Sequence, residues 1–320
     1  MKSIASAPAK IILLGEHFVV YGSKAMLAAI DKRVTVTSSF TEDKTIKIKS
    51  RLGTLEVPIY VSHQEVKSEF RPFVYLAKKM LISAKADTER WKNMRPAEGL
   101  EIAINSDIPV GVGLGSSSAC CVAATASIYG LFKKLSSEEI VEISIEAEKT
   151  IFPDTSGADC TVCTYGGMIV YDKINGIEKI DSTKYKIKDF ETVTDLNFII
   201  ANSMIPHSTK RSVERVKKFK ENDEDEFARK VGYVTNIIND VLYALKNNDD
   251  DDKLEMRNCV GFRDDIEFNM AHNRMLLDGI GVSNKTIDSM ISSLVRGTDN
   301  GGAALVSAKI TGAGDGGCII

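Results

Sequence analysis

The stretch Asp107-Ile-Pro-Val-Gly-Val-Gly-Leu-Gly-Ser-Ser-Ser-Ala119 places three glycines at alternate positions and follows them at once with three serines. A strand-like segment at 100–105 precedes it, and small residues at 119–132 predict a helix after it. Glycines let backbone N–H groups approach an anion, and the unpaired amides at a helix N-terminus favour phosphate. The stretch therefore predicts a strand, a phosphate-binding loop and a helix, with serine hydroxyls close enough to reach a magnesium ion.

Two alternatives exist for this glycine-rich stretch. It is not a Walker loop, because no Gly-Lys-Ser/Thr follows the glycines. A plain turn that ends in a serine N-cap would have the same composition. We favour nucleotide binding over the plain turn.

The composition is that of an ordinary globular protein, with 43% hydrophobic and 27% charged residues in 320. A net charge of -3 argues against a nucleic-acid partner or a membrane surface. No apolar run approaches the length of a membrane span, and Lys10, Glu16 and His17 interrupt any signal-peptide core. Six scattered cysteines form no disulfide framework, so we expect a cytoplasmic protein, and a homodimer stays open.

Ionisable residues also interrupt the first apolar segment of the chain. Lys10 precedes Ile11-Ile-Leu-Leu14, and Glu16 and His17 separate that run from Phe18-Val-Val-Tyr21. Burying a charge is unfavourable unless it is paired, so these residues either face water at strand ends or belong to a functional site. We favour a substrate or phosphate site, and we expect residues 3–20 to form two strands around a turn.

The hydrophobic patterns along the chain predict an α+β fold in two domains. The first domain, 1–185, combines a sheet with helices and carries the glycine-rich loop. The second, 186–320, places helices on a small antiparallel sheet. Strands are expected at 25–30, 33–40, 45–50, 54–61, 100–105, 168–171, 196–201 and 304–311, and helices at 70–86, 119–132, 136–149, 212–220, 224–246, 254–277 and 283–296. Residues 160–165 fit either a helix start or a strand.

A second glycine-rich turn, Gly312-Ala-Gly-Asp-Gly-Gly-Cys318, lies near the end of the chain. The sequence stops two residues later, where a strand begins, so we expect the second domain to lack a terminal strand and helix. The pair Cys160 and Cys163 is interpreted as two small core residues, because no second pair or nearby histidine supports zinc. The aspartates at 249–252 are interpreted as a solvated loop and not as a metal site.

Lys10 with Glu16-His17, the loop 111–118 and the turn 312–317 resemble, in this order, the three motifs of the GHMP family of small-molecule kinases. The resemblance covers nearly the whole chain. Within that family, the segment from Ala7 to Gly22 is similar to the mevalonate kinases. Ser156-Gly-Ala-Asp159 resembles the catalytic turn of those enzymes, and Ser208-Thr-Lys210 resembles a further segment of theirs.

The resemblance implies phosphorylation of the 5-hydroxyl of mevalonate, with ATP as donor and Mg²⁺ as cofactor. Asp159 would accept the hydroxyl proton, Lys10 would lie close to Asp159, and Thr209 would hydrogen-bond it. Glu16 and His17 would bind mevalonate.

The resemblance also implies how the nucleotide and the metal are held. Ser117 and Glu148 would hold magnesium against the phosphates, since this ion takes oxygen ligands. The residues expected to contact the nucleotide are Gly111, Val112, Gly113, Leu114, Gly115, Ser116, Ser117, Ser118, Gly312 and Gly314.

Several positions depart from the family pattern. Ser118 replaces the usual alanine, and Asp154 is a second carboxylate near Asp159 and a weaker candidate for the base. Asp315 stands in a turn that is usually all glycine, where it would repel triphosphate unless it points away.

Other functions left open are a related kinase (mevalonate 3-kinase, phosphomevalonate kinase or homoserine kinase) and a catalytically silent nucleotide-binding sensor.

Overall fold

The computed structural model describes residues 1–86, 99–180, 198–205, 209–246, 262–296 and 307–320. These residues form two compact units, each discontinuous in sequence. The first unit consists of Met1–Lys10, Ala29–Val110 and Gly115–Gly166, and the second of Ile11–Ala28, Gly111–Leu114 and Gly167–Ile320. The boundary expected between residues 185 and 186 lies outside the described residues and stays a prediction.

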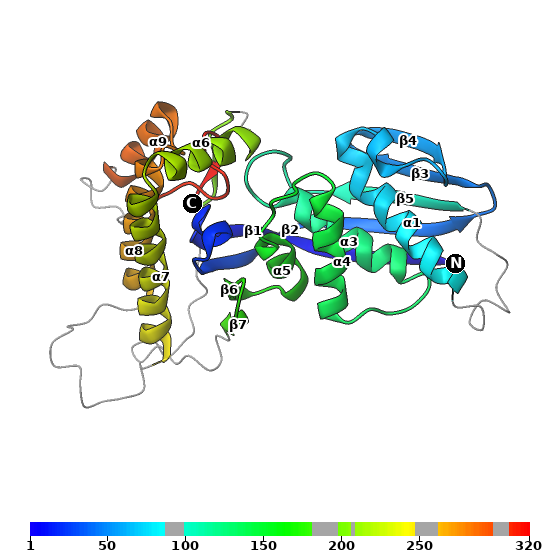
Figure 1. Ribbon diagram of the computed structural model, residues 1–320, viewed down its shortest axis with the longest axis horizontal. Helices are drawn as coiled ribbons and strands as arrows, with labels where there is room; N and C mark the ends of the chain where they lie inside the picture. The colour runs from blue at the N-terminus through cyan, green and yellow to red at the C-terminus, as the bar shows by residue number, and fades with distance from the viewer. Residues whose placement is uncertain (87–98, 181–197, 206–208, 247–261, 297–306) are drawn as a thin grey trace. The chain divides into compact units, whose positions relative to one another are not determined.

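The first unit is built on a mixed sheet (Figure 1). Its strands follow the order β4-β3-β5-β2, and β1 pairs with β2. The β3–β5 pair is parallel, whereas β3–β4 and β2–β5 are antiparallel. The strand bounds are Lys2–Leu14 (β1), Ala25–Thr41 (β2), Thr45–Ser50 (β3), Gly53–Pro58 (β4) and Gly99–Ser106 (β5).

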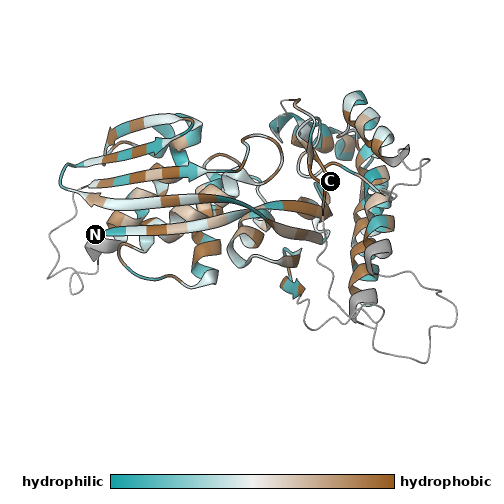
Figure 2. Ribbon diagram, turned by 180° about the vertical axis from the view of Figure 1, so that it is seen from behind, coloured by the Kyte–Doolittle hydropathy of each residue, from teal (hydrophilic) through white to brown (hydrophobic). Residues whose placement is uncertain are grey.

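Alternating hydropathy explains why these segments form strands. In β3, Ile46 and Ile48 are fully buried, and the lysines between and after them point to the other face. Figure 2 shows the same alternation as bands along the strands of this unit. One face of the sheet therefore carries the apolar side chains that the helices cover.

Among the described residues, the α-helices of the first unit are Arg71–Ala86 (α1), Ser116–Tyr129 (α3), Ser137–Lys149 (α4) and Ala158–Tyr165 (α5). In Figure 1, α1, α3 and α4 lie on the near face of the sheet, and Figure 2 shows the opposite face. Helix α3 contacts α1, α4 and α5. Its small residues allow this crowding, because Ala119, Ala123 and Ala124 are all fully buried.

Helix α4 begins where the sequence predicts. The Ser136 hydroxyl accepts a hydrogen bond from the Glu139 amide at 3.2 Å, and the Glu139 carboxylate accepts one from the Ser136 amide at 2.8 Å. This reciprocal capping box satisfies two amides that the first helical turn leaves unpaired. It also fixes the start of the helix that carries Glu148.

The second unit combines helices with strands β6 and β7, which pair with each other and continue the sheet beside Ala25–Ala28 of β2, and with the separate antiparallel pair β8–β9. Helix α7 packs against α6, α8 and the short 3-10 helix η1 (Phe18–Tyr21), where the Phe18 and Phe227 ring centroids lie 5.9 Å apart. The remaining bounds are Met168–Asp172 (β6), Gly176–Ile180 (β7), Ala201–Asn202 (β8), Cys318–Ile319 (β9), Thr209–Asn222 (α6), Glu224–Lys246 (α7), Phe262–Gly279 (α8) and Lys285–Arg296 (α9).

The α+β class is confirmed, and so are most of the predicted helices, but several strand predictions are wrong. Residues 18–21 form the 3-10 helix η1, because Gly15 and His17 turn the backbone with positive φ. Residues 25–41 form one continuous strand and not two. Residues 198–200 lie outside any strand, and only Ala201–Asn202 pairs with β9. Of the predicted strand 304–311, the described part makes a single bridge, Ile310 to Ile319.

Several predicted features fall on residues that the structure leaves undescribed. They are the start of the helix expected at 254–277, the aspartates at 249–252, and the loop residues His207 and Ser208. Within the described part of the chain, no helix is both long and apolar enough to cross a bilayer.

Candidate active site

In the first unit, Lys10 and Asp159 form an ion pair. The Lys10 Nζ lies 2.9 Å from the Asp159 Oδ2, and the side chains are 2% and 30% exposed. Asp159 stands in the first turn of α5, directly after Gly157, whose φ of 86° starts the helix in a left-handed conformation. The pair joins β1 to the start of α5, and the Asp159 side chain stays partly exposed.

The Lys10 side chain also lies against Gly115, the last glycine before α3. A Cβ atom placed at Gly115 would come within 2.7 Å of the Lys10 Cγ and 2.8 Å of its Cε. Gly115 is therefore needed both for its φ of 71° and for the room that Lys10 occupies. The structure thus brings together three residues that the sequence predicted for the site.

Gly115 is also the N-cap of α3, and no side chain caps this helix. The predicted alternative, a turn capped by a serine, is therefore wrong for this helix. The first amides of the helix belong to Ser116, Ser117 and Ser118. Gly115, which precedes them, has no side chain that could accept their hydrogen bonds. Such an N-terminus attracts an anion through its N–H groups and its dipole.

Glu148 lies buried in α4 near the start of α3. Its carboxylate accepts hydrogen bonds from the Ser118 hydroxyl and, at 2.7 Å, from the Thr155 hydroxyl. Burial raises the pKa of Glu148, the like charge of Asp159 raises it further, and the hydroxyl donors oppose the rise. The serine hydroxyl that contacts Glu148 is that of Ser118. Ser117 is half-buried, and its predicted role as a magnesium ligand beside Glu148 stays a prediction.

Asp154, Cys160 and Cys163 lie in surroundings that differ from those of Asp159. Asp154 is exposed, in contrast to the partly buried Asp159. Cys160 and Cys163 are buried, and burial raises the pKa of both thiols well above the ordinary value. The Cys160 thiol donates to Glu148 at 3.6 Å. Buried, protonated thiols confirm the interpretation as small core residues.

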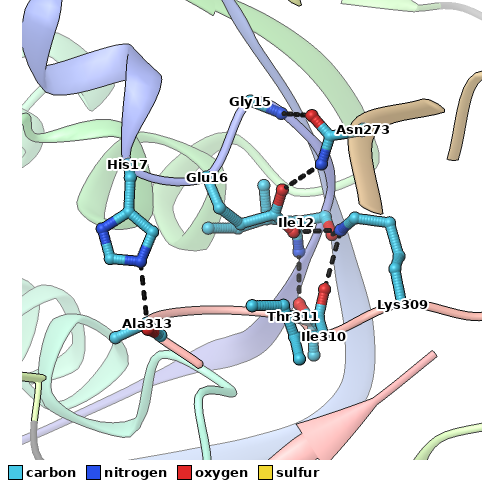
Figure 3. A network of polar contacts seen from close by, with 9 residues as sticks. All are labelled: Ile12, Gly15, Glu16, His17, Asn273, Lys309, Ile310, Thr311 and Ala313. Carbon is cyan, nitrogen blue, oxygen red and sulfur yellow. Dashed lines mark hydrogen bonds and ion pairs between the residues drawn. The ribbon is translucent and has the colours of Figure 1, made fainter. Parts of the chain in front are cut away.

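In the second unit, Glu16 and His17 leave their turn in different directions (Figure 3). The Glu16 carboxylate faces Lys309 and Asn273, and pairs with the Lys309 ammonium. The His17 Nε2–H donates to the Ala313 carbonyl at 3.0 Å. Burial lowers the pKa of His17 to about 4, against the smaller opposing effect of that hydrogen bond, so the ring is neutral at pH 7.

Two glycine-rich segments lie backbone to backbone in the second unit. A Cβ at Gly113 would come within 2.3 Å of the Thr311 carbonyl oxygen, and one at Gly312 within 2.8 Å of the Gly113 Cα. The Cys318 amide donates to the Val112 carbonyl at 2.9 Å. The structure thereby brings part of the predicted phosphate loop against the third motif, although the two are about 200 residues apart in sequence.

The anomalous Asp315 has its own partner. The Arg215 Nη2 lies 3.3 Å from the Asp315 Oδ2, and the Asp315 amide donates to the Val282 carbonyl at 2.7 Å. Its φ of 61° is the left-handed conformation that asparagine and aspartate tolerate better than most residues. The negative charge of Asp315, which was expected to repel triphosphate, is therefore paired with the Arg215 guanidinium.

Thr209 begins α6 in the second unit, half-buried. Its predicted hydrogen bond to Asp159 stays a prediction. Gly314 is held in the third motif, where a Cβ would meet the Val282 carbonyl oxygen at 2.2 Å.

Sequence reasoning missed the partners of the predicted residues, namely Thr155, Arg215, Asn273 and Lys309. A signal existed for Lys309, which interrupts an apolar run in the same way as Lys10 does. A charge in such a run has to find a partner, but the sequence does not say which one.

The comparisons with known proteins agree with this arrangement. The family model for the GHMP kinases N terminal domain matches residues 76–167. The chain is 35% identical over 332 residues to the mevalonate kinase of Pyrococcus furiosus, covering 100% of this chain and 88% of that protein. It is 32% identical over 324 residues to the mevalonate kinase of Thermococcus sibiricus, with the same coverage.

Among solved structures, the mevalonate kinase of Methanococcus jannaschii matches with a TM-score of 0.71 and 23% identity, over 100% of this chain and 90% of that one. This similarity supports the fold, and the sequence identity of the curated relatives over the full chain supports the family. The chain belongs to the GHMP kinase family, and within it to the mevalonate kinases.

Proposed function

We propose that this protein phosphorylates the 5-hydroxyl of mevalonate, with ATP as donor and Mg²⁺ as the required metal. The observation that carries the proposal is the Lys10–Asp159 ion pair at 2.9 Å, with the Lys10 side chain lying against Gly115 of the phosphate loop. One lysine thus connects a candidate proton acceptor with a candidate phosphate site. A phosphoryl-transfer enzyme needs both, since its main tasks are positioning and charge neutralisation.

Asp159 is the proposed acceptor of the hydroxyl proton. Its carboxylate is 30% exposed, so an alcohol can approach it, whereas the Lys10 ammonium beside it is almost fully buried. The ammonium holds the carboxylate in place and stabilises the negative charge that develops on the attacking oxygen. Proton removal by a positioned carboxylate contributes about a hundredfold to ten-thousandfold to such reactions.

The amides of 111–118 are proposed to hold the phosphate oxygens of ATP. The uncapped N-terminus of α3 supports this role, since a bound phosphate would satisfy its free amides. In the second unit, Gly312 and Gly314 extend the bare backbone that lies against Gly113. The pairing of Asp315 with Arg215 keeps its charge compensated beside these amides.

The donors on α3 and α4 fit a magnesium ion. Glu148 and the hydroxyl of Ser117 supply oxygen ligands of the kind this ion prefers, and it usually takes few protein ligands beside phosphate and water. The described residues contain no group of three or more His, Cys, Asp or Glu side chains that could hold a metal by themselves. When bound, magnesium would neutralise charge on the transferring phosphate. The protein contributes the Ser118 and Thr155 hydroxyls, which orient Glu148.

Mevalonate is proposed to contact His17. The Nε2–H of this neutral ring is bound to Ala313, so Nδ1 is left as a hydrogen-bond acceptor suited to a hydroxyl of the substrate. The sequence assigns Glu16 to the same task, and that assignment stays a prediction. A cytoplasmic location and a homodimer likewise stay expectations from the sequence.

The test is a coupled assay of ADP release with a panel of small alcohols. We expect magnesium-dependent turnover with mevalonate well above that with phosphomevalonate or homoserine. Turnover of another alcohol without turnover of mevalonate would reject the proposal, and nucleotide binding without turnover of any alcohol would indicate a silent sensor.

A further inference from the structure

A buried ion pair in the second unit joins the first motif to the third. Glu16, in the turn after β1, pairs with Lys309, which lies 293 positions away in sequence. Both side chains are almost completely buried, at 1% and 0% exposure. Asn273, on α8, completes what we call the Glu16–Lys309–Asn273 network (Figure 3).

Every oxygen of the Glu16 carboxylate has a protein donor. Oε1 accepts from the Lys309 ammonium, and Oε2 accepts from the Asn273 Nδ2 at 2.9 Å. The Asn273 Oδ1 in turn accepts from the Gly15 amide at 3.2 Å. Asn273 therefore fixes both the backbone of the turn and the side chain of Glu16.

Lys309 distributes its remaining hydrogen bonds over backbone carbonyls. Its ammonium donates to the Ile12 carbonyl at 3.2 Å and to the Ile310 carbonyl at 2.7 Å. The Ile12 amide donates to the Thr311 hydroxyl at 2.8 Å. These bonds hold β1 beside the segment that leads into Gly312.

The network adjoins a strained residue in sequence. His17 has a φ of 62°, an uncommon conformation for a residue other than glycine, asparagine or aspartate. Such strain persists only where the surroundings impose it. On one side of His17 the network anchors Gly15 and Glu16, and on the other its own ring is bound to Ala313.

We infer that Glu16 is a positioning residue and not a ligand of the substrate: its carboxylate, held by Lys309 and Asn273, sets the turn that presents His17. The inference rests on the proposed function for the identity of the substrate. It gives Lys309 and Asn273, which have no recognisable motif in the sequence, the same positioning role. The Glu16 side chain is 1% exposed and each of its oxygens already accepts a hydrogen bond from the protein, so little of the carboxylate is open to a substrate.

The decisive experiment exchanges the carboxylate and the amide. The double variant Glu16→Gln/Asn273→Asp keeps one negative charge near Lys309. The introduced glutamine carries no charge, yet its amide can donate to the introduced carboxylate while its carbonyl accepts from Lys309. The introduced carboxylate still accepts from the Gly15 amide. The network therefore survives although position 16 no longer carries a carboxylate.

The two single variants should behave differently from the exchange. Glu16→Gln leaves Lys309 without a charged partner, and Asn273→Asp places two carboxylates together. We expect each to lower the unfolding midpoint and to raise the KM for mevalonate about tenfold or more, with the KM for ATP much less affected. The exchange should restore the midpoint and bring kcat/KM to within about fivefold of wild type.

The matched control is Glu224→Gln/Asn222→Asp, the same chemical exchange at two exposed positions of the second unit. It should leave both the midpoint and kcat/KM unchanged. An exchange variant that regains its midpoint but not its kcat/KM would show that the Glu16 carboxylate contacts substrate, and would overturn the inference. An exchange that regains neither, or a Glu16→Gln variant identical to wild type, would overturn it too.

Failure of the proposed function would be recognised separately. Absence of mevalonate turnover in the wild-type chain rejects that function. The unfolding midpoints need no substrate, so they still decide whether the three side chains act as one network.

Discussion

At the scale of single residues, the two aspartates near the start of α5, Asp154 and Asp159, have the same side chain in different surroundings. Asp159 is paired with Lys10 and partly buried, whereas Asp154 is exposed. A general base has to be held within reach of the proton that it removes. The ion pair supplies that restraint for Asp159, and an exposed side chain has no comparable restraint.

We predict that Asp159→Asn lowers kcat by about a hundredfold or more, because the amide cannot accept the proton. Nucleotide affinity should change little, since the side chain acts on the acceptor alcohol. Steady-state kinetics and direct nucleotide titration would check the two effects. Asp154→Asn is the control and should keep near-wild-type turnover. The opposite ranking would move the base to Asp154.

Substitutions of Ser117 and Ser118, at the start of α3, should have different effects on stability and on the magnesium requirement. Ser118 donates to the buried Glu148, so Ser118→Ala should lower the free energy of unfolding by roughly 1–3 kcal/mol. Ser117→Ala should instead raise the Mg²⁺ concentration needed for half-maximal activity, with little change in stability. Denaturant unfolding and a magnesium titration of activity would distinguish them. Equal effects of both variants on stability would contradict the assignment.

At the scale of elements, the glycine-rich segments of the second unit matter for their close backbone approach. Gly111 and Gly113 have similar positive φ values of 71° and 87°. A Cβ at Gly111 meets nothing within 4 Å, whereas one at Gly113 would meet the Thr311 carbonyl oxygen at 2.3 Å. The two positions therefore separate backbone strain from steric exclusion.

We predict that Gly113→Ala destabilises the protein by about 1–3 kcal/mol more than Gly111→Ala does. Both variants carry the strain of a left-handed alanine, but only the first forces two backbone segments apart. Comparison of their denaturation midpoints without ligand would check the difference. Similar midpoints would mean that residues 111–114 do not pack against Thr311 in solution.

At the scale of the whole molecule, the half-buried His17 links stability to pH. Its folded-state pKa of about 4 lies below the ordinary 6.5, so the unfolded chain binds a proton that the folded chain refuses. The contribution of His17 to the free energy of unfolding is fully present above pH 6.5 and is lost as the pH falls towards 4. A pKa shift from 6.5 to about 4 corresponds to roughly 3 kcal/mol of that free energy.

We predict that His17→Asn flattens the pH dependence of the unfolding free energy between pH 6.5 and pH 4. Asparagine tolerates the positive φ of this position, which limits the effect of the substitution at neutral pH. Unfolding at a series of pH values would check it. Glu148, whose pKa is raised, contributes with the opposite sign in both proteins and cancels in the comparison. Parallel pH profiles would contradict a lowered pKa of His17.

Much of this protein follows from its sequence, because local patterns determine local structure. The apolar periodicity of 224–246 predicts α7 with its bounds, and Ser136 with Glu139 predicts the start of α4. Unusual charges in apolar runs indicate a site at Lys10, Glu16 and His17. The resemblance of three motifs then leads to the family that the comparisons confirm.

Only the tertiary structure decided which groups meet. Ser118 reaches Glu148, Arg215 neutralises Asp315, and Lys309 pairs with Glu16. The sequence shows that a buried charge needs a partner, but the choice of partner depends on how elements far apart in the chain pack. Residues 18–21 illustrate the same limit, since a strand-like apolar run becomes a 3-10 helix where the preceding turn is held by contacts from α8. Local patterns specify what each segment tends to form, and long-range packing selects its neighbours.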